Sequence, residues 1–81
     1  MKLSIVIPVY NERDTIEQVV ERVADTPFDK EIIIVDDASS DGTGEVVQKL
    51  TNQPGIRVFT HARNRGKGAA LRTGFTQATG D

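Results

Sequence analysis

The chain has 81 residues, 37% of them hydrophobic and 27% charged, with a formal net charge of −2 and no cysteine. This length allows one small domain over residues 1–81, and the acidic balance argues against a general nucleic-acid binder. The lack of cysteine excludes disulfides and thiolate metal sites. The apolar runs are too short to span a bilayer and nothing indicates export. A cytoplasmic protein is therefore expected, with membrane association left open for a longer parent.

Residues 3–9, "LSIVIPV", predict the first strand. The segment is short and rich in β-branched residues, which is typical of a buried parallel strand. Pro8 lacks an N–H group, so we expect it near the end of the strand. The charged and apolar N-terminus also has some features of a secretory signal. However, polar residues interrupt the run and no small-residue cleavage site follows.

Residues 14–26 predict the first helix. Asp14 and Glu17 have the spacing of a capping box at its start, and Pro27 is expected to end it. Apolar residues recur at the i, i+3, i+4, i+7 spacing of one helix face. The residues expected on that face are Ile16, Val19, Val20 and Val23.

A second strand, residues 30–36, is apolar on both faces and leads into a second helix. Ser40 is the expected N-cap of this helix, and Pro54 with Gly55 predicts the turn that follows it. The residues expected to be buried on the second helix are Val46, Val47 and Leu50.

Residues 56–61 predict the third strand, and residues 66–80 predict the third helix. Gly80 is a natural residue to follow the last turn of that helix. The residues expected to face inward are Ala70, Leu71, Gly74, Phe75 and Ala78.

Strands that alternate with helices predict a βαβαβα unit of the α/β class, with parallel strands and helices on both faces of the sheet. Ligands of such sheets bind outside the carboxyl ends of the strands. Three polar segments fall at those ends, namely "PVYNE" (8–12), "DDASSDGT" (36–43) and "HARNRGKG" (61–68). The sequence therefore predicts a site on this rim.

Two common nucleotide motifs are missing. "PVYNE" follows the first strand where a dinucleotide fold needs its G-x-G-x-x-G pattern. "GKG" at 66–68 lacks the upstream glycine and the Ser or Thr of a P-loop. These glycines still allow a phosphate to approach the backbone at a helix start, with Lys67 as a point charge. A solvated glycine-rich helix start is an equal alternative.

Asp36 and Asp37 end an apolar strand, and each allows two interpretations. They mark the exit of the strand to solvent, or they accept hydrogen bonds from a base or ribose, because a carboxylate offers acceptors and no donors. His61 is the only histidine. We interpret it as a hydrogen-bonded structural group and not as a general base.

Three further features also allow either a binding role or a structural one. They are Tyr10, Glu12 and the basic run of Arg63, Arg65 and Lys67. Tyr10 offers a face for stacking a base or packs half-buried. Glu12 is a pocket acid or a solvated loop residue. The basic run neutralises a diphosphate or faces solvent.

Taken together, "SIVIPVYNE", "IIIVDDASSDGT" and "RNRGKGAALRTGF" resemble the N-terminal part of family 2 glycosyltransferases. The likeness is greatest to polyprenyl-phosphate sugar synthases, such as the dolichyl-phosphate mannose synthase group. The resemblance covers essentially the whole chain. It implies the GT-A fold, a nucleoside diphosphate sugar of the UDP or GDP type as ligand, Mg²⁺ or Mn²⁺ in the full-length family, and inverting transfer to a lipid phosphate or glycan.

By this resemblance seven residues bind the nucleotide, while no catalytic residue or metal ligand is assigned. Asp37, with Asp36, reads the base or ribose, and Lys67, with Arg65, lies near the base or diphosphate. The nucleotide-binding residues implied are Pro8, Tyr10, Glu12, Asp36, Asp37, Arg65 and Lys67.

The chain departs from the family pattern at its end. The metal-binding D-x-D motif of the family follows an "ATGD"-like segment, and the chain stops at Asp81 within that segment. The motif and the acceptor-binding half are absent, so we expect a fragment that binds no metal well and is inactive alone. The alternatives are a non-catalytic nucleotide-binding module or a fragment that only self-associates. A response-regulator receiver is set aside because its acidic pair should follow the first strand.

The resemblance also implies a sheet order of 3-2-1 with the first strand at an open edge. An unpaired strand edge invites another chain. A homodimer through the first strand, or through a swapped terminal helix, is therefore expected.

Overall fold

The computed structural model describes residues 2–27 and 29–78. In these residues the strands form one parallel sheet in the order β1-β2-β3, so the predicted order is confirmed. Strands and helices alternate along the chain, as the sequence predicted. The elements are β1 (Leu3–Val9), α1 (Ile16–Ala24), β2 (Lys30–Asp36), α2 (Thr43–Leu50), β3 (Ile56–Thr60) and α3 (Lys67–Gln77).

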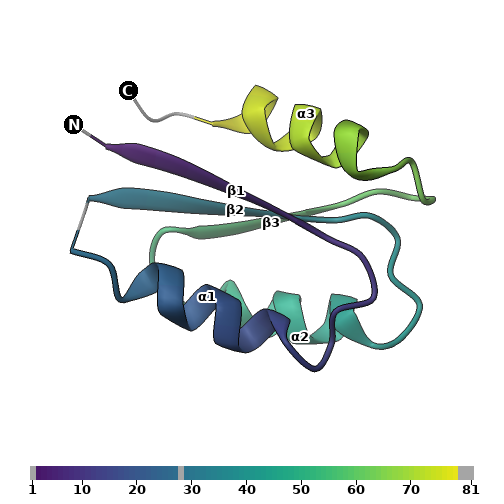
Figure 1. Cartoon of the computed structure of the whole chain (residues 1–81), viewed down its shortest axis with the longest axis horizontal. Coiled ribbons are helices and arrows are strands. Elements are labelled where there is room, and N and C mark those ends of the chain that lie inside the picture. Colours follow the sequence, from purple (N-terminus) through teal and green to yellow (C-terminus); the bar gives the residue numbers. More distant parts are fainter. Residues whose placement is uncertain (1, 28, 79–81) are drawn as a thin grey trace.

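The sheet is the middle of three layers. α1 and α2 lie on one of its faces and α3 on the other (Figure 1). β2 is the central described strand and is covered on both sides, which explains why its sequence is apolar without alternation. Its successive side chains point to opposite faces, so Ile34 packs toward α1 and α2 while Ile33 and Val35 pack toward α3.

The two faces have different cores. The face of α1 and α2 holds the larger apolar cluster, and on the α3 face a smaller one is bordered by polar groups. The buried members of the larger cluster are Val9, Ile16, Val20, Ile32, Ile34, Val47, Leu50 and Ile56. Those of the smaller cluster are Ile33, Val35 and Ala70.

α3 approaches β1 so closely that only glycine fits at the contact. A Cβ atom on Gly74 would lie 2.2 Å from Cγ1 of Val6. This contact restricts how α3 is rotated about its axis. Phe75, predicted to face inward, is 62% exposed as a result, because adjacent helical residues point about 100° apart.

Other predictions for α3 and β3 have mixed outcomes. Ala70 and Gly74 are buried as predicted, while Leu71 and Ala78 are half-buried. α3 ends at Gln77, and Gly80 lies outside the described residues. β3 ends one residue before the predicted boundary, although the N–H of His61 still donates to the carbonyl oxygen of Asp36.

The capping predictions for the first two helices are wrong. α1 begins after Thr15 with no side-chain cap, because the N–H groups of Thr15 and Ile16 both donate to the carbonyl oxygen of Glu12 in the preceding turn. Val19, expected to be buried, is 39% exposed. α2 begins after Gly42, whose φ is +95°.

Ser40 is not the cap of α2 because the helix begins only after Gly42, two residues later. The N–H group of Ser40 bonds to another loop. It donates to Oδ1 of Asn11 in the loop that follows β1. The residues predicted to be buried on α2 are confirmed, with Val47 and Leu50 buried and Val46 packed against the same cluster. Among the described residues, no helix is long and apolar enough to cross a membrane.

Candidate functional site

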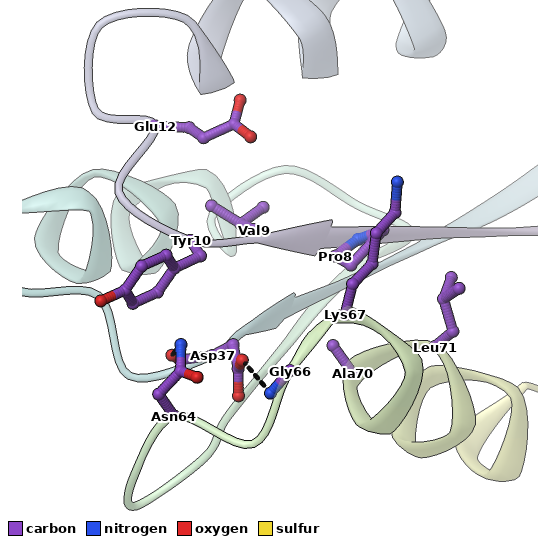
Figure 2. Close-up of a pocket in the computed structure, with 10 residues that line it drawn as sticks. All are labelled: Pro8, Val9, Tyr10, Glu12, Asp37, Asn64, Gly66, Lys67, Ala70 and Leu71. Atoms are coloured by element: carbon purple, nitrogen blue, oxygen red, sulfur yellow. Dashed lines mark hydrogen bonds between the residues drawn. The ribbon is translucent and has the colours of Figure 1, made fainter.

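A cavity of about 580 Å³ opens at the carboxyl ends of β1 and β2, on the side covered by α3. Its size is within the range of small-molecule sites. In Figure 2 the Tyr10 ring and the Lys67 side chain extend from opposite ends of this cavity, with Asp37 between them. The lining residues are Pro8, Val9, Tyr10, Glu12, Asp37, Asn64, Gly66, Lys67, Ala70 and Leu71.

The two adjacent acids point to opposite faces of the sheet, because side chains alternate along a strand. The buried Asp36 accepts hydrogen bonds from the N–H and the hydroxyl of Ser39, the former at 3.1 Å. A Cβ on Gly44 of α2 would lie 3.1 Å from Asp36 Oδ2. Asp36 therefore holds the loop between β2 and α2, away from the cavity.

Asp37 points the other way, and the loop after β3 surrounds its carboxylate. Its Oδ1 lies 2.7 Å from Nδ1 of His61 and accepts the N–H of Arg65 at 2.9 Å. Its Oδ2 accepts the N–H of Gly66 at 2.8 Å. A carboxylate has about four acceptor positions, so these contacts leave one position, on Oδ2, for a ligand.

The environment of Asp37 favours its charged form. Burial alone raises the pKa of this carboxyl, but hydrogen bonds from the His61 ring and from the N–H groups of Arg65 and Gly66 oppose it. The net result is that the pKa of Asp37 is lowered from its ordinary value. Asp37 is therefore an ionised acceptor at neutral pH.

The loop that contains Tyr10 and Glu12 is hydrogen-bonded to the neighbouring β2–α2 loop. The N–H of Asn11 donates to the Ser39 hydroxyl at 2.9 Å, and the N–H of Glu12 donates to the Thr43 hydroxyl at 2.9 Å. Asn11 has a φ of +52°, a conformation that asparagine tolerates better than most residues. These bonds hold the β1 side of the cavity in place.

Five of the seven residues assigned to nucleotide binding line the cavity, namely Pro8, Tyr10, Glu12, Asp37 and Lys67. The other two do not. Asp36 is turned toward α2, and the Arg65 side chain lines a separate hollow along α3 with Arg72 and Thr73. Arg65 contributes to the cavity through its backbone, by donating its N–H to Asp37.

Sequence reasoning missed Asn64, which lines the cavity and whose Nδ2 lies 3.4 Å from the carbonyl oxygen of Asp37. Asparagine is a common loop residue, so its presence there does not by itself indicate a binding role. The apolar wall of Val9, Ala70 and Leu71 was not assigned either. Helical periodicity marked Ala70 and Leu71 as inward-facing without indicating a cavity.

His61 is a hydrogen-bonded structural group, as predicted. Its side chain is 7% exposed, and its Nε2 lies 2.8 Å from the hydroxyl of Thr73. Within residues 2–27 and 29–78, no group of three or more His, Asp or Glu side chains is placed to hold a metal ion.

The sequence comparison identifies the family to which this three-layer fold belongs. Residues 4–81 match the family "Glycosyl transferase family 2". The chain belongs to this family, and its three-layer sheet is part of a GT-A fold.

Among curated relatives, a dolichol-phosphate mannosyltransferase from Pyrococcus furiosus is 36% identical over all of this chain and 24% of its own length. An undecaprenyl-phosphate 4-deoxy-4-formamido-L-arabinose transferase from Yersinia enterocolitica is 39% identical over 99% of this chain and 26% of its own. The chain thus spans about a quarter of the length of these relatives.

Two solved structures have the same arrangement of elements. A mannosyltransferase from Pyrobaculum calidifontis, in complex with GDP-Man and Mn²⁺, superposes with a TM-score of 0.88 at 30% identity, over 96% of this chain and 24% of that protein. S. aureus TarS in complex with UDP-GlcNAc superposes with a TM-score of 0.84 at 30% identity, over 99% of this chain and 24% of that one.

Proposed function

We propose that this chain is the nucleotide-binding part of a glycosyltransferase, and that the cavity holds the nucleoside diphosphate of a UDP- or GDP-linked sugar. The observation that carries this proposal is the joint presence of Tyr10, Asp37 and Lys67 around one cavity. An aromatic face, a carboxylate acceptor and a cation are the groups needed for a base, its N–H donors and a phosphate.

Asp37 is proposed to read the base or the ribose. Its side chain is only 4% exposed, and it retains one acceptor position beyond the bonds from His61, Arg65 and Gly66. A donor of the ligand would therefore form a hydrogen bond to a charged group that is shielded from water, which is stronger than a neutral one. Tyr10 is 48% exposed at the rim, where its ring is free to cover a base.

Lys67 is proposed to face the diphosphate. It is the first residue of α3, where the positive end of the helix dipole adds to its own charge. The N–H group of Gly66 is already bonded to Asp37 and is not available to a phosphate, whereas Lys67 supplies a positive charge at this helix start.

For the longer protein we propose inverting transfer of the sugar to a lipid phosphate. The support is that curated relatives are named as dolichol-phosphate and undecaprenyl-phosphate sugar transferases. Among the described residues no group of three or more His, Asp or Glu side chains could hold a metal ion, and the chain alone is proposed to bind nucleotide without transferring sugar. A parent gene without a D-x-D motif would favour the alternative, a non-catalytic nucleotide-binding module.

The binding proposal is tested by NMR titration with UDP, GDP, UDP-GlcNAc and GDP-Man. Chemical shift changes are expected around residues 8–12 and 36–37. Asp37→Ala should weaken binding by about 1–3 kcal/mol, because a buried charged acceptor is lost. Asp14→Ala is the matched control, since that carboxylate is 91% exposed. The absence of shifts near the cavity at millimolar nucleotide would contradict the proposal.

We further propose that the chain self-associates through β1. This strand is an edge of the described sheet, and Leu3 at its start is 38% exposed. Two copies could pair their β1 strands antiparallel about a twofold axis, or exchange a terminal helix. Light scattering over a dilution series tests this. A monomer at tens of micromolar whose β1 amides are protected from exchange would exclude both forms.

A further inference from the structure

Three side chains form a continuous hydrogen-bonded chain beside the cavity. Asp37 Oδ1 lies 2.7 Å from His61 Nδ1, and His61 Nε2 lies 2.8 Å from Thr73 Oγ1. These two hydrogen bonds join the end of β2 to the end of β3 and then to the middle of α3. His61 and Thr73 are not among the cavity-lining residues, so neither is placed to touch a ligand there.

The bonding partners define which nitrogen of His61 carries hydrogen. An ionised Asp37 can only accept, so Nδ1 of the imidazole donates to it. In the neutral ring, Nε2 then has a free lone pair and accepts the hydroxyl hydrogen of Thr73. Each group in the sequence Thr73–His61–Asp37 thus donates to the next one.

Asp37 also fixes the start of α3 directly. Its Oδ2 accepts the N–H of Gly66, the N-cap residue. Gly66 has φ +96° and ψ 160°, a conformation restricted essentially to glycine. α3 is therefore attached to the strand ends at two points, its N-cap and Thr73. Two attachment points set both the position and the rotation of the helix.

We infer that His61 and Thr73 are positioning residues for the nucleotide cavity. They orient the Asp37 carboxylate so that its remaining acceptor position faces the cavity. They also hold α3 at the rotation that places Lys67 and Leu71 on the cavity wall. This inference rests on the proposed nucleotide-binding function and assigns roles to two residues outside the pocket.

The order Asp–His–Thr is also that of a nucleophilic triad, but a second feature of such sites is missing. Acyl transfer needs N–H donors aimed at the developing oxyanion. Thr73 lies inside α3, where neighbouring N–H groups donate along the helix. The chain of bonds is therefore suited to holding groups in place and not to attacking a substrate.

The test compares Thr73→Val with Thr73→Ser. Valine has nearly the shape of threonine and lacks the hydroxyl, whereas serine keeps it. With UDP and GDP as probes, we expect Thr73→Val to weaken nucleotide affinity about fivefold to tenfold, the effect of losing one hydrogen bond. Thr73→Ser should stay within about twofold of the parent chain. Equal affinities for both variants and the parent chain would overturn the inference.

A second pair of variants covers the case that Thr73→Val does not fold. The amide of His61→Asn reaches the Nδ1 position and can still donate to Asp37, whereas that of His61→Gln reaches the Nε2 position. His61→Asn should bind nucleotide more tightly than His61→Gln by about fivefold. Equal affinities of these two variants would contradict the proposed role of the Asp37 contact.

A readout without ligand separates this inference from the nucleotide proposal. In the free protein, the amides of Arg65 and Gly66 should be protected from exchange, and protection should fall in Thr73→Val and His61→Gln. The ¹⁵N spectrum of His61 should report hydrogen on Nδ1. Unchanged protection overturns the positioning role. If protection falls as expected but the parent chain binds neither nucleotide, the nucleotide proposal fails and the positioning of the loop and α3 stands.

Discussion

The two faces of the sheet are stabilised by different means. Toward α1 and α2 the described residues form a cluster with eight buried apolar members, and toward α3 a cluster with three. Buried polar groups lie on both sides: Asp36 and Thr43 toward α2, and on the α3 side Asp37 under the loop and Glu31 farther down β2. Glu31 accepts the Ser4 hydroxyl at 2.7 Å and lies 3.5 Å from Arg57.

This difference indicates a division of roles. Apolar burial is not directional and contributes most of the folding free energy, so the face of α1 and α2 is expected to provide stability. Hydrogen bonds contribute less net stability but fix geometry. The α3 face uses them to shape the cavity. Substitutions on the two faces should therefore differ in whether they change stability or the arrangement of the site.

The largest effect is expected from Ile34→Ala on the face of α1 and α2. Ile34 is fully buried, and removing its side chain should lower the free energy of unfolding by about 2–5 kcal/mol. Chemical denaturation followed by circular dichroism measures it. Ile33→Ala on the α3 face is the comparison. A larger loss for Ile33→Ala than for Ile34→Ala would contradict the division between the faces.

Gly74→Ala tests the close contact between α3 and β1. The added methyl would overlap Val6, and we expect a loss of about 1–3 kcal/mol from overpacking. Gly68→Ala is the matched control on the same helix. A Cβ there would meet nothing nearer than 3.7 Å, so alanine should stabilise the helix by up to about 1 kcal/mol. If both substitutions stabilise the chain, the contact with Val6 does not restrain α3.

Asp37→Asn should reduce stability by about 1–3 kcal/mol at neutral pH, because the amide replaces an acceptor with a donor. The pKa of Asp37 is lowered in the folded chain. Its contribution is therefore fully present above the ordinary carboxyl pKa of about 4 and is lost as pH falls through the folded value.

Urea denaturation of the parent chain and of Asp37→Asn between pH 7 and pH 2 measures this contribution. The difference between the two proteins should shrink as the pH falls. A constant difference across that range would show that the charge of Asp37 does not contribute.

The smallest effect is expected in the loop between β2 and α2. Ala38 has a φ of +61°, which disfavours residues with a Cβ. Ala38→Gly should stabilise the fold by about 0.3–1 kcal/mol, after allowing for the greater entropy of unfolded glycine. Ala62→Gly, a loop position without positive φ, should be neutral or slightly destabilising. Ala38→Gly should therefore raise the melting temperature, whereas Ala62→Gly should leave it unchanged or lower it.

The element order, the parallel sheet and the rim site could be predicted because hydrophobic patterns and strand ends are local features. The caps could not, because they depend on contacts between loops. Ser40 has the side chain of a cap, but α2 begins only after Gly42, and the loop that contains Ser40 is held by a bond from its N–H to Asn11, 29 residues away. The exposure of Phe75 depends on the contact between Gly74 and Val6, which has no signal in the helical pattern.

The sequence predicted which segments form the candidate site, but not which way every side chain in them points. Asp37 and Lys67 could be assigned because they lie at the ends of predicted elements. The different orientations of Asp36 and Asp37 follow from strand alternation. Which acid faces the cavity depends on the face that α3 covers, and that is a property of the crossover connections.

Because their partners lie at different separations along the chain, these two acids are expected to form their contacts at different stages of folding. Asp36 binds Ser39 only three residues away, so this contact closes a very short loop. Asp37 binds His61 and Gly66, 24 and 29 residues away, and must wait for β3 and the start of α3. Contacts that form after the transition state affect mainly the unfolding rate. Asp37→Asn should therefore accelerate unfolding, while Asp36→Asn should slow refolding more, so two neighbouring residues would report on different stages of one folding reaction.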